Sequence, residues 1–225
     1  MNANGFEKLH GIDEMDEKQV LTLCRTAEQL TRQKLSGTIE LYRPVKVQTG
    51  RTPRQTGARR IRRTNVMKRI GILGAGTWGM ALARMLTVSG NDVLVWSAIE
   101  KEIDSLSTTR KHPNLPQMKI PDELRFTKSI EEVCKDKDIL LFAVPSVFVR
   151  STAAKARPYV ADGQIIVDVA KGIEPDTLYT MTEILADELG KEGGPKGVRL
   201  VALSGPTHAE EVAIDLPTTI VSASK

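Results

Sequence analysis

The chain has 225 residues, 40% of them hydrophobic, which suits one large globular domain or one domain with a tail. Its net charge of +4 originates in the first 66 residues, which contain 13 Lys and Arg residues and 7 Asp and Glu residues. No apolar run reaches the roughly 20 residues of a membrane helix, and no hydrophobic signal segment opens the chain. Two distant cysteines, Cys24 and Cys134, exclude a disulfide framework and a metal motif. We therefore expect a cytoplasmic protein with no membrane partner and no bound metal.

Residues 1–66 are predicted to be an extension that precedes the folded domain. Within it we expect an amphipathic helix over residues 17–35 and a linker over residues 48–64, which includes the basic run Arg59–Arg63. Such a run can bind nucleic acid, but it is more often a solvated tail, so we do not expect nucleic acid as a partner. Five acidic residues among the first 17 argue against an organelle transit peptide.

A glycine-rich turn between a predicted strand and a predicted helix is the most informative segment. Gly74, Gly76 and Gly79 match the pattern G-x-G-x-x-G. In this pattern the first glycine permits a tight turn, the second lets a pyrophosphate approach the backbone, and the third lets the helix pack on the strand. The N–H groups and the positive dipole end of the helix then face the phosphates. The turn predicts a dinucleotide site; the alternative is a glycine-rich turn without a ligand.

From residue 67 onward, buried strands alternate with amphipathic helices. The continuous apolar run over 139–144 is typical of strands covered on both faces, as in a parallel sheet between helix layers. We therefore predict an α/β fold with a doubly wound parallel sheet of the Rossmann type, and a dinucleotide-binding domain over residues 67–225. Strands are predicted over 68–74, 92–96, 138–144, 164–169, 198–203 and 217–223, and helices over 77–89, 99–107, 128–136, 147–156, 176–190 and 207–213.

The strand over 92–96 should end where the adenosine ribose binds. In many NAD sites an acidic side chain about 20 residues beyond the glycine turn accepts hydrogen bonds from the ribose. Here Trp96 is followed by Ser97, Ala98 and Ile99, so neither Asp nor Arg stands at the strand end. Glu100 is a candidate, but a solvent-facing glutamate at a helix start is the simpler interpretation. The choice between NAD and NADP stays open.

Six segments arrive in an order that is far more specific than the glycine pattern. They are GAGTWGMALA, the N-x-V-x-V-W strand from Asn91 to Trp96, HPNLPQMKIP, AVPS, AKGIE and LSGPTHAEEVA. Together they resemble NAD(P)-dependent glycerol-3-phosphate dehydrogenase over roughly Met67 to Ser224. The resemblance implies hydride transfer between NAD or NADP and a small phosphate substrate, interconverting dihydroxyacetone phosphate and glycerol 3-phosphate.

The resemblance also implies roles for individual residues. Phe148 would pack on the cofactor and Ala209 would approach it through its backbone, whereas the plain alternative for Phe148 is a core aromatic. Lys171 would contact cofactor and substrate, where an ammonium can stabilise a developing oxyanion. The expected cofactor-binding residues are Gly74, Ala75, Gly76, Thr77, Trp78, Gly79, Phe148, Lys171 and Ala209, and the expected substrate-binding residues are Lys171, Gly205 and Thr207.

Thr207 is also predicted to cap a helix. Glu210 follows three residues later and would complete a capping box. His208 is interpreted as a packing or capping residue rather than a catalytic one.

In this family the general acid/base lysine, and most groups that hold the substrate phosphate, lie in a helical second domain. The chain ends at Lys225 before such a domain, so we assign no catalytic residue and expect little or no activity from this chain alone. Three alternatives stay open: a non-catalytic NAD-binding protein, a nucleic-acid-binding protein that works through its basic segment, and another hydroxyacid or ketoacid reductase. The sequence leaves homo-oligomer formation undecided.

Overall fold

The computed structural model describes residues 67–224. The predicted extension, its helix over 17–35, its linker and basic run, and Cys24 lie outside the described residues. Within residues 67–224 seven strands form one sheet in the order β3-β2-β1-β4-β5-β6-β7. All neighbouring strands are parallel except β6 and β7, which are antiparallel. This order, with its reversal at β1, is that of the doubly wound dinucleotide-binding sheet, so the predicted fold class is confirmed.

The elements follow the predicted alternation of strands and helices closely. None of the helices among the described residues is long and apolar enough to cross a membrane. The strands are β1 (Arg69–Leu73), β2 (Asp92–Trp96), β3 (Arg125–Thr127), β4 (Ile139–Phe142), β5 (Ile165–Asp168), β6 (Arg199–Ser204) and β7 (Val221–Ser224); the α-helices are α2 (Thr77–Val88), α3 (Glu100–Thr109), α4 (Ile130–Cys134), α5 (Val149–Ala156), α6 (Met181–Leu189) and α7 (Ala209–Ala213), and the 3₁₀ helices are η1 (Ser146–Phe148) and η2 (Arg157–Tyr159).

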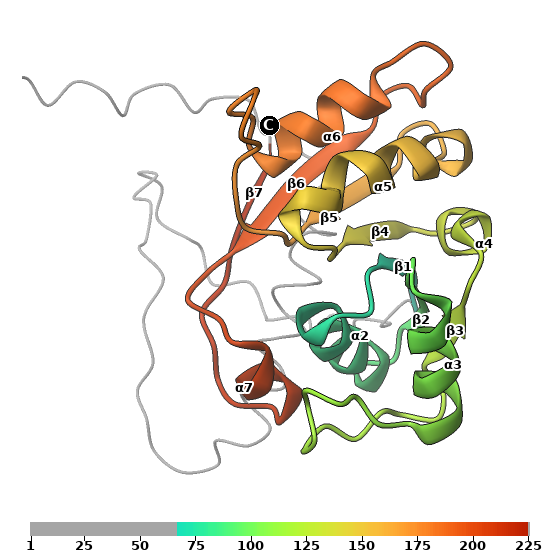
Figure 1. Cartoon of the computed structure of the whole chain (residues 1–225), viewed down its shortest axis with the longest axis vertical. Helices are drawn as coiled ribbons and strands as arrows, with labels where there is room; N and C mark the ends of the chain where they lie inside the picture. The colour runs from blue at the N-terminus through green and yellow to red at the C-terminus, as the bar shows by residue number, and fades with distance from the viewer. Residues whose placement is uncertain (1–66, 225) are drawn as a thin grey trace, which may run out of the picture.

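Helices cover both faces of the sheet. Side chains of α2, α3 and α7 belong to one core, and side chains of α4, α5 and α6 belong to the other (Figure 1). Strand side chains alternate between the two cores: Ile70 and Ile72 of β1 enter the first, and Leu73 enters the second. Both faces of the central strands are therefore buried, which explains why β4 is apolar throughout and why β1 and β5 are apolar except for Arg69 and Asp168 at their ends.

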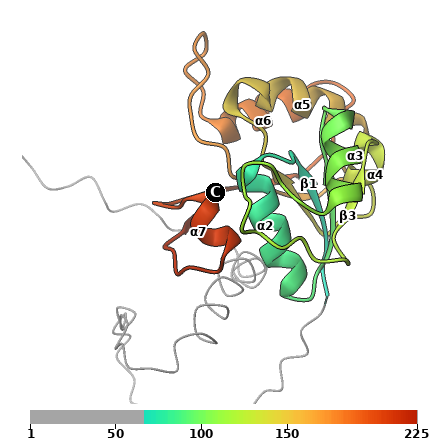
Figure 2. The same cartoon turned by 60° about the horizontal axis from the view of Figure 1, so that its bottom comes forward.

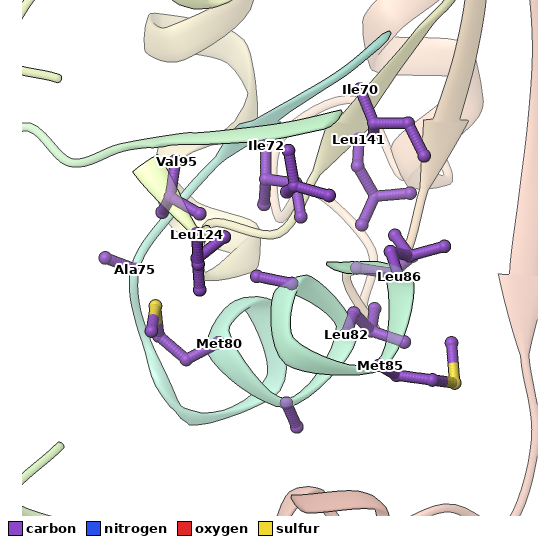
Figure 3. Close-up of a cluster of buried hydrophobic side chains, with 14 of the residues drawn as sticks. Ile70, Ile72, Ala75, Met80, Leu82, Met85, Leu86, Val95, Leu124 and Leu141 are labelled. Carbon is purple, nitrogen blue, oxygen red and sulfur yellow. The ribbon is translucent and has the colours of Figure 1, made fainter. Parts of the chain in front are cut away.

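The core beneath α2 holds the start of this helix against the sheet. Met80, Leu82 and Leu86 of α2 pack against side chains of β1, and Leu141 of β4 and Leu124 complete the layer (Figure 3). Each such side chain is at most 2% exposed, and burying one contributes about 1.5–3 kcal/mol. The helix axis is thereby set relative to the carboxyl ends of β1 and β4.

Two predicted elements begin too early, and one strand was not predicted. The helix predicted over 176–190 begins only at Met181, because Ile173 and Thr180 form an isolated bridge before it and Thr180 and Glu183 form the capping box. The strand predicted over 217–223 begins at Val221. Strand β3 was not predicted at all, since three residues are too few to show a period.

The predicted capping box at Thr207 is also wrong. The helix α7 begins at Ala209, its N-cap is His208, and no side chain caps it. The backbone N–H of Thr207 donates instead to the carbonyl oxygen of Gly205 at 2.9 Å. This turn delays the start of the helix by two residues.

Candidate functional site

The glycine turn between β1 and α2 has a geometry that only glycine permits at two positions. Gly74 has φ +124°, and a Cβ there would lie 2.6 Å from the carbonyl oxygen of Ala143. A Cβ on Gly79 would lie 2.1 Å from the carbonyl oxygen of Gly74. Since backbone atoms make both contacts, no side-chain movement can relieve them, and α2 comes as close to β1 as a backbone can.

Gly76 differs from Gly74 and Gly79 because the space that a side chain would occupy there is open. It is the N-cap of α2 with φ −65° and ψ 178°, and no atom lies within 4 Å of the position of a Cβ. The first helical hydrogen bond runs from the N–H of Met80 to the carbonyl oxygen of Gly76 at 2.9 Å. The N–H groups of the first turn have no partner inside the helix, and this turn holds no acidic residue. The arrangement suits an anion placed over Gly76.

A cleft of about 520 Å³ opens beside this turn. Its walls come from the carboxyl ends of β1, β4 and β5 and from the start of α7, the edge of the sheet at which open α/β folds bind ligands. Ser146, His208 and Glu210 also line the cleft, although the sequence did not single them out as binding residues. The predicted site residues that line it are Gly76, Thr77, Trp78, Lys171, Thr207 and Ala209.

The remaining predicted site residues lie near the cleft without lining it. The side chain of Ala75 is buried in the core, so only its backbone can face a ligand. Gly205 does not line the cleft, but its carbonyl oxygen accepts a hydrogen bond from the ammonium of Lys171, which does. Phe148, in η1, is 55% exposed, so its alternative interpretation as a core aromatic is wrong. The signal for Ser146 was its position two residues after the predicted strand over 138–144, whereas His208 and Glu210 lie within the predicted helix over 207–213.

Lys171 connects two loops across one end of the cleft. Its ammonium Nζ donates a hydrogen bond to the carbonyl oxygen of Gly205 at 2.9 Å. The loop that carries it is anchored by Glu174, whose carboxylate accepts two hydrogen bonds of 2.7 Å from Arg150 on α5. These bonds hold the pKa of Glu174 at about 2, well below its usual value. The carboxylate is therefore ionised throughout the neutral range and the loop stays tied to α5.

A second ion pair joins the two helices that flank the cleft. Arg84 on α2 makes a bidentate pair with Asp215, which follows α7, through bonds of 2.6 and 3.0 Å. The two side chains are only 14% and 15% exposed, so solvent screens their attraction weakly. The pair fixes the position of α7 relative to α2, as their close packing in Figure 2 illustrates.

Asp168, at the end of β5, is a buried acid that the sequence analysis missed. It is 4% exposed and faces the α5 and α6 layer, where burial raises its pKa to about 7. One stabilising contact opposes this shift, the backbone N–H of Ala170, which donates to Oδ1 at 3.3 Å. The signal in the sequence was an Asp inside an otherwise apolar strand, directly before the AKGIE segment.

The remaining acidic side chains, histidines and cysteine of the described residues form no metal centre. Among residues 67–224 no three His, Cys, Asp or Glu side chains lie together as a metal site would require. Cys134 is a buried thiol whose pKa is raised to about 12 by its burial. Glu100 is exposed, and its carboxylate lies 3.5 Å from the ammonium of Lys128, which matches its simpler interpretation.

The family model for the NAD-dependent glycerol-3-phosphate dehydrogenase N-terminus matches residues 69–225. The chain belongs to this family. A relative in Lactobacillus delbrueckii subsp. bulgaricus, glycerol-3-phosphate dehydrogenase [NAD(P)+] 2, is 69% identical over 157 residues, which cover 70% of this chain and 47% of the relative. A second relative, glycerol-3-phosphate dehydrogenase [NAD(P)+] of Agathobacter rectalis, is 47% identical over 160 residues, which cover 71% of this chain and 46% of the relative.

Solved structures support this family assignment. The crystal structure of glycerol-3-phosphate dehydrogenase from Coxiella burnetii superposes with a TM-score of 0.61 at 30% identity, covering 70% of this chain and 47% of that one. The family member described here thus spans about half the length of the curated relatives that it matches. The predicted resemblance over roughly Met67 to Ser224 is confirmed by the matched range.

Proposed function

We propose that residues 67–225 form a dinucleotide-binding domain that holds NAD(P)H in the cleft at the glycine turn. The open space over Gly76 carries this proposal. A dinucleotide needs a place where its pyrophosphate can reach backbone N–H groups, and a Cβ-free position at a helix start offers that. Gly74 and Gly79 would shape the turn, while Thr77 and Trp78 would border the phosphates.

The domain would supply the cofactor half of a glycerol-3-phosphate dehydrogenase site. The bound nicotinamide supplies or accepts the hydride; the residues of this chain bind and orient the two reactants. Lys171 would place its ammonium beside the reacting oxygen of dihydroxyacetone phosphate, where it stabilises the negative charge that develops. Thr207 and Gly205 would add substrate contacts on the opposite loop, and Ala209 would meet the cofactor through its backbone. Phe148 would pack on the bound cofactor from its exposed position.

This function supports two further expectations about the protein. The substrate would be a small phosphate, since the names of the relatives include glycerol 3-phosphate. A cytoplasmic location follows from the proposed use of a nicotinamide pool that cells keep inside. Both are proposals for this chain.

The test is a calorimetric titration of the 225-residue protein with NADH. We expect saturable binding at one site per chain and a large loss of affinity in Gly76→Val, because the new side chain would fill the space of the pyrophosphate. Ser105→Val, on the exposed side of α3, is the matched control and should bind NADH as the parent protein does. Equal affinity in the parent and in Gly76→Val would refute the assignment of the glycine turn.

A further inference from the structure

Two segments that line the cleft pack directly on each other. Ser146, at the start of η1, and Lys171, in the loop between β5 and α6, both line it. Gly172 brings this loop against η1: it has φ +149°, and a Cβ there would lie 3.0 Å from Cβ of Ser146. The backbone next to Lys171 can therefore pack closely on η1 because Gly172 has no side chain.

The loop over residues 171–180 has no buried anchor of its own. Every residue in this range is exposed except Glu174, which is half-buried. The apolar side chains of Ile173 and Leu178 are 60% and 69% exposed. A segment without buried apolar contacts opens at little cost in free energy unless polar contacts hold it. The position of Lys171 therefore depends on polar contacts such as those of Glu174.

Arg150 holds Glu174 from the first turn of α5, directly after η1. Its Nε and Nη2 donate to the two carboxylate oxygens of Glu174 at 2.7 Å each. Arg150 is held in turn by α6, since its Nη1 donates to Asp187 and lies 3.5 Å from the carboxylate of Glu188. A planar guanidinium fixed in this way presents its two donors in one geometry. It ties the Lys171 loop to η1 at a second point.

Arg157 belongs to the same group of ion pairs but does not hold the loop. Its Nη1 donates to the carboxylate of Glu188 at 3.0 Å and to the carbonyl oxygen of that residue at 3.2 Å. Within residues 67–224 the side-chain hydrogen bonds of Arg157 reach Glu188 only. The two arginines thus share a buried partner on α6, and Arg150 alone of the two connects it to the loop of Lys171.

We propose that Arg150 is a positioning residue for dinucleotide binding, which keeps Lys171 at its place in the cleft by holding Glu174. The proposal rests on the proposed dinucleotide site and adds a residue outside the cleft on which its affinity depends. Arg150 does not line the cleft, so its effect reaches the ligand through the loop of Lys171.

Calorimetric titrations of the 225-residue chain with NADH test this role. Arg150→Gln removes the bidentate pair and should weaken NADH binding about tenfold, the factor expected when a charge-assisted hydrogen bond from Lys171 is lost. Arg157→Gln is the matched control, because it also removes a cation from Glu188. It should bind NADH as the parent does, whereas a merely structural effect would appear in both variants.

A double-mutant cycle separates positioning from an independent contribution to binding. Lys171→Ala alone should also weaken NADH binding about tenfold. Adding Arg150→Gln to Lys171→Ala should weaken it little further, whereas independent contributions would multiply to about a hundredfold. Glu174→Gln is a second variant that keeps an oxygen for the hydroxyl of Thr177, which donates to Glu174 at 2.6 Å. It should lose as much affinity as Arg150→Gln.

The proposal is overturned if Arg150→Gln binds NADH as the parent does, if Arg157→Gln weakens binding as much as Arg150→Gln, or if the losses of Arg150→Gln and Lys171→Ala multiply. Should Arg150→Gln fail to fold, Glu174→Gln takes its place in each comparison. A parent protein that does not bind NADH overturns the proposed function itself, so the two failures are distinct.

Discussion

Replacing Asp168 with Asn should change how the stability of the protein depends on pH. The carboxyl group has a pKa of about 7 in the fold against an ordinary value of about 3.8. Since the folded-state pKa is raised, the unfolded chain releases this proton at a lower pH than the folded protein does. The free energy of unfolding therefore falls as pH rises from about 4 to about 7, and the loss is complete above pH 7.

The size of this effect follows from the difference between the two pKa values. About three pH units at 1.36 kcal/mol each correspond to roughly 4 kcal/mol. Asp168→Asn cannot ionise, and its side-chain oxygen can still accept the N–H of Ala170. Its extra amide protons, if unpaired, add a cost of about 1–3 kcal/mol that is the same at every pH. The difference in stability between variant and parent should thus move in favour of the variant by about 4 kcal/mol between pH 4 and pH 8.

Urea denaturation followed by circular dichroism, at intervals from pH 4 to pH 8.5, measures this difference. Asp176→Asn is the matched control, because Asp176 is exposed on the loop after Glu174, and its stability difference should stay within about 0.5 kcal/mol throughout. A difference between Asp168→Asn and the parent that does not change with pH would refute the reasoning, since it would mean that Asp168 is ionised in the fold at neutral pH.

Three other perturbations separate structure from binding. Gly79→Ala should lower the free energy of unfolding by about 3 kcal/mol or more, because the new Cβ would lie 2.1 Å from a carbonyl oxygen. Gly76→Ala has open space around the new Cβ and should cost no more than about 1 kcal/mol in the same urea experiment. Equal costs for the two variants would contradict the geometry of the turn. Asp215→Asn should lower the free energy of unfolding by about 3 kcal/mol, because it leaves the partly buried Arg84 without its counter-charge. Asp92→Asn breaks the more exposed pair with Arg125 and should cost less than about 1 kcal/mol. The reverse order would show that burial does not decide the strength of these two ion pairs. The 225-residue chain alone should oxidise NADH with dihydroxyacetone phosphate far below the median enzyme rate of about 10 s⁻¹. Lys171 is proposed to stabilise the developing oxyanion, and no second lysine lines the cleft among the described residues to donate the proton. Turnover near that rate, abolished by Lys171→Ala, would make Lys171 the proton donor.

The glycine turn and the central strands could be predicted from the sequence because local chemistry determines them. Gly74 and Gly79 stand where a side chain cannot fit, and the apolar run of β4 is long enough to indicate burial on both faces. Likewise Lys171 and Thr207 each follow a predicted strand, so their meeting at one edge of the sheet follows from parallel topology.

The features that escaped prediction depend on contacts between distant segments. Arg84 and Asp215 are 131 residues apart, and nothing in either neighbourhood indicates the other. The short strand β3 exists because β2 supplies its hydrogen-bond partners. Tertiary packing decides each of these cases.

The central claim is that the first turn of α2 holds a pyrophosphate, and amide chemical shifts measured by nuclear magnetic resonance test it most directly. Adding NADH to the isotopically labelled 225-residue protein should shift the amide signals of Gly76, Thr77 and Trp78 most strongly, with smaller shifts in the loop of Lys171. The amide of Gly163, in the turn before β5 at the opposite end of the sheet, should stay in place. Saturable binding of NADH that leaves the amides of the glycine turn unmoved would contradict the account.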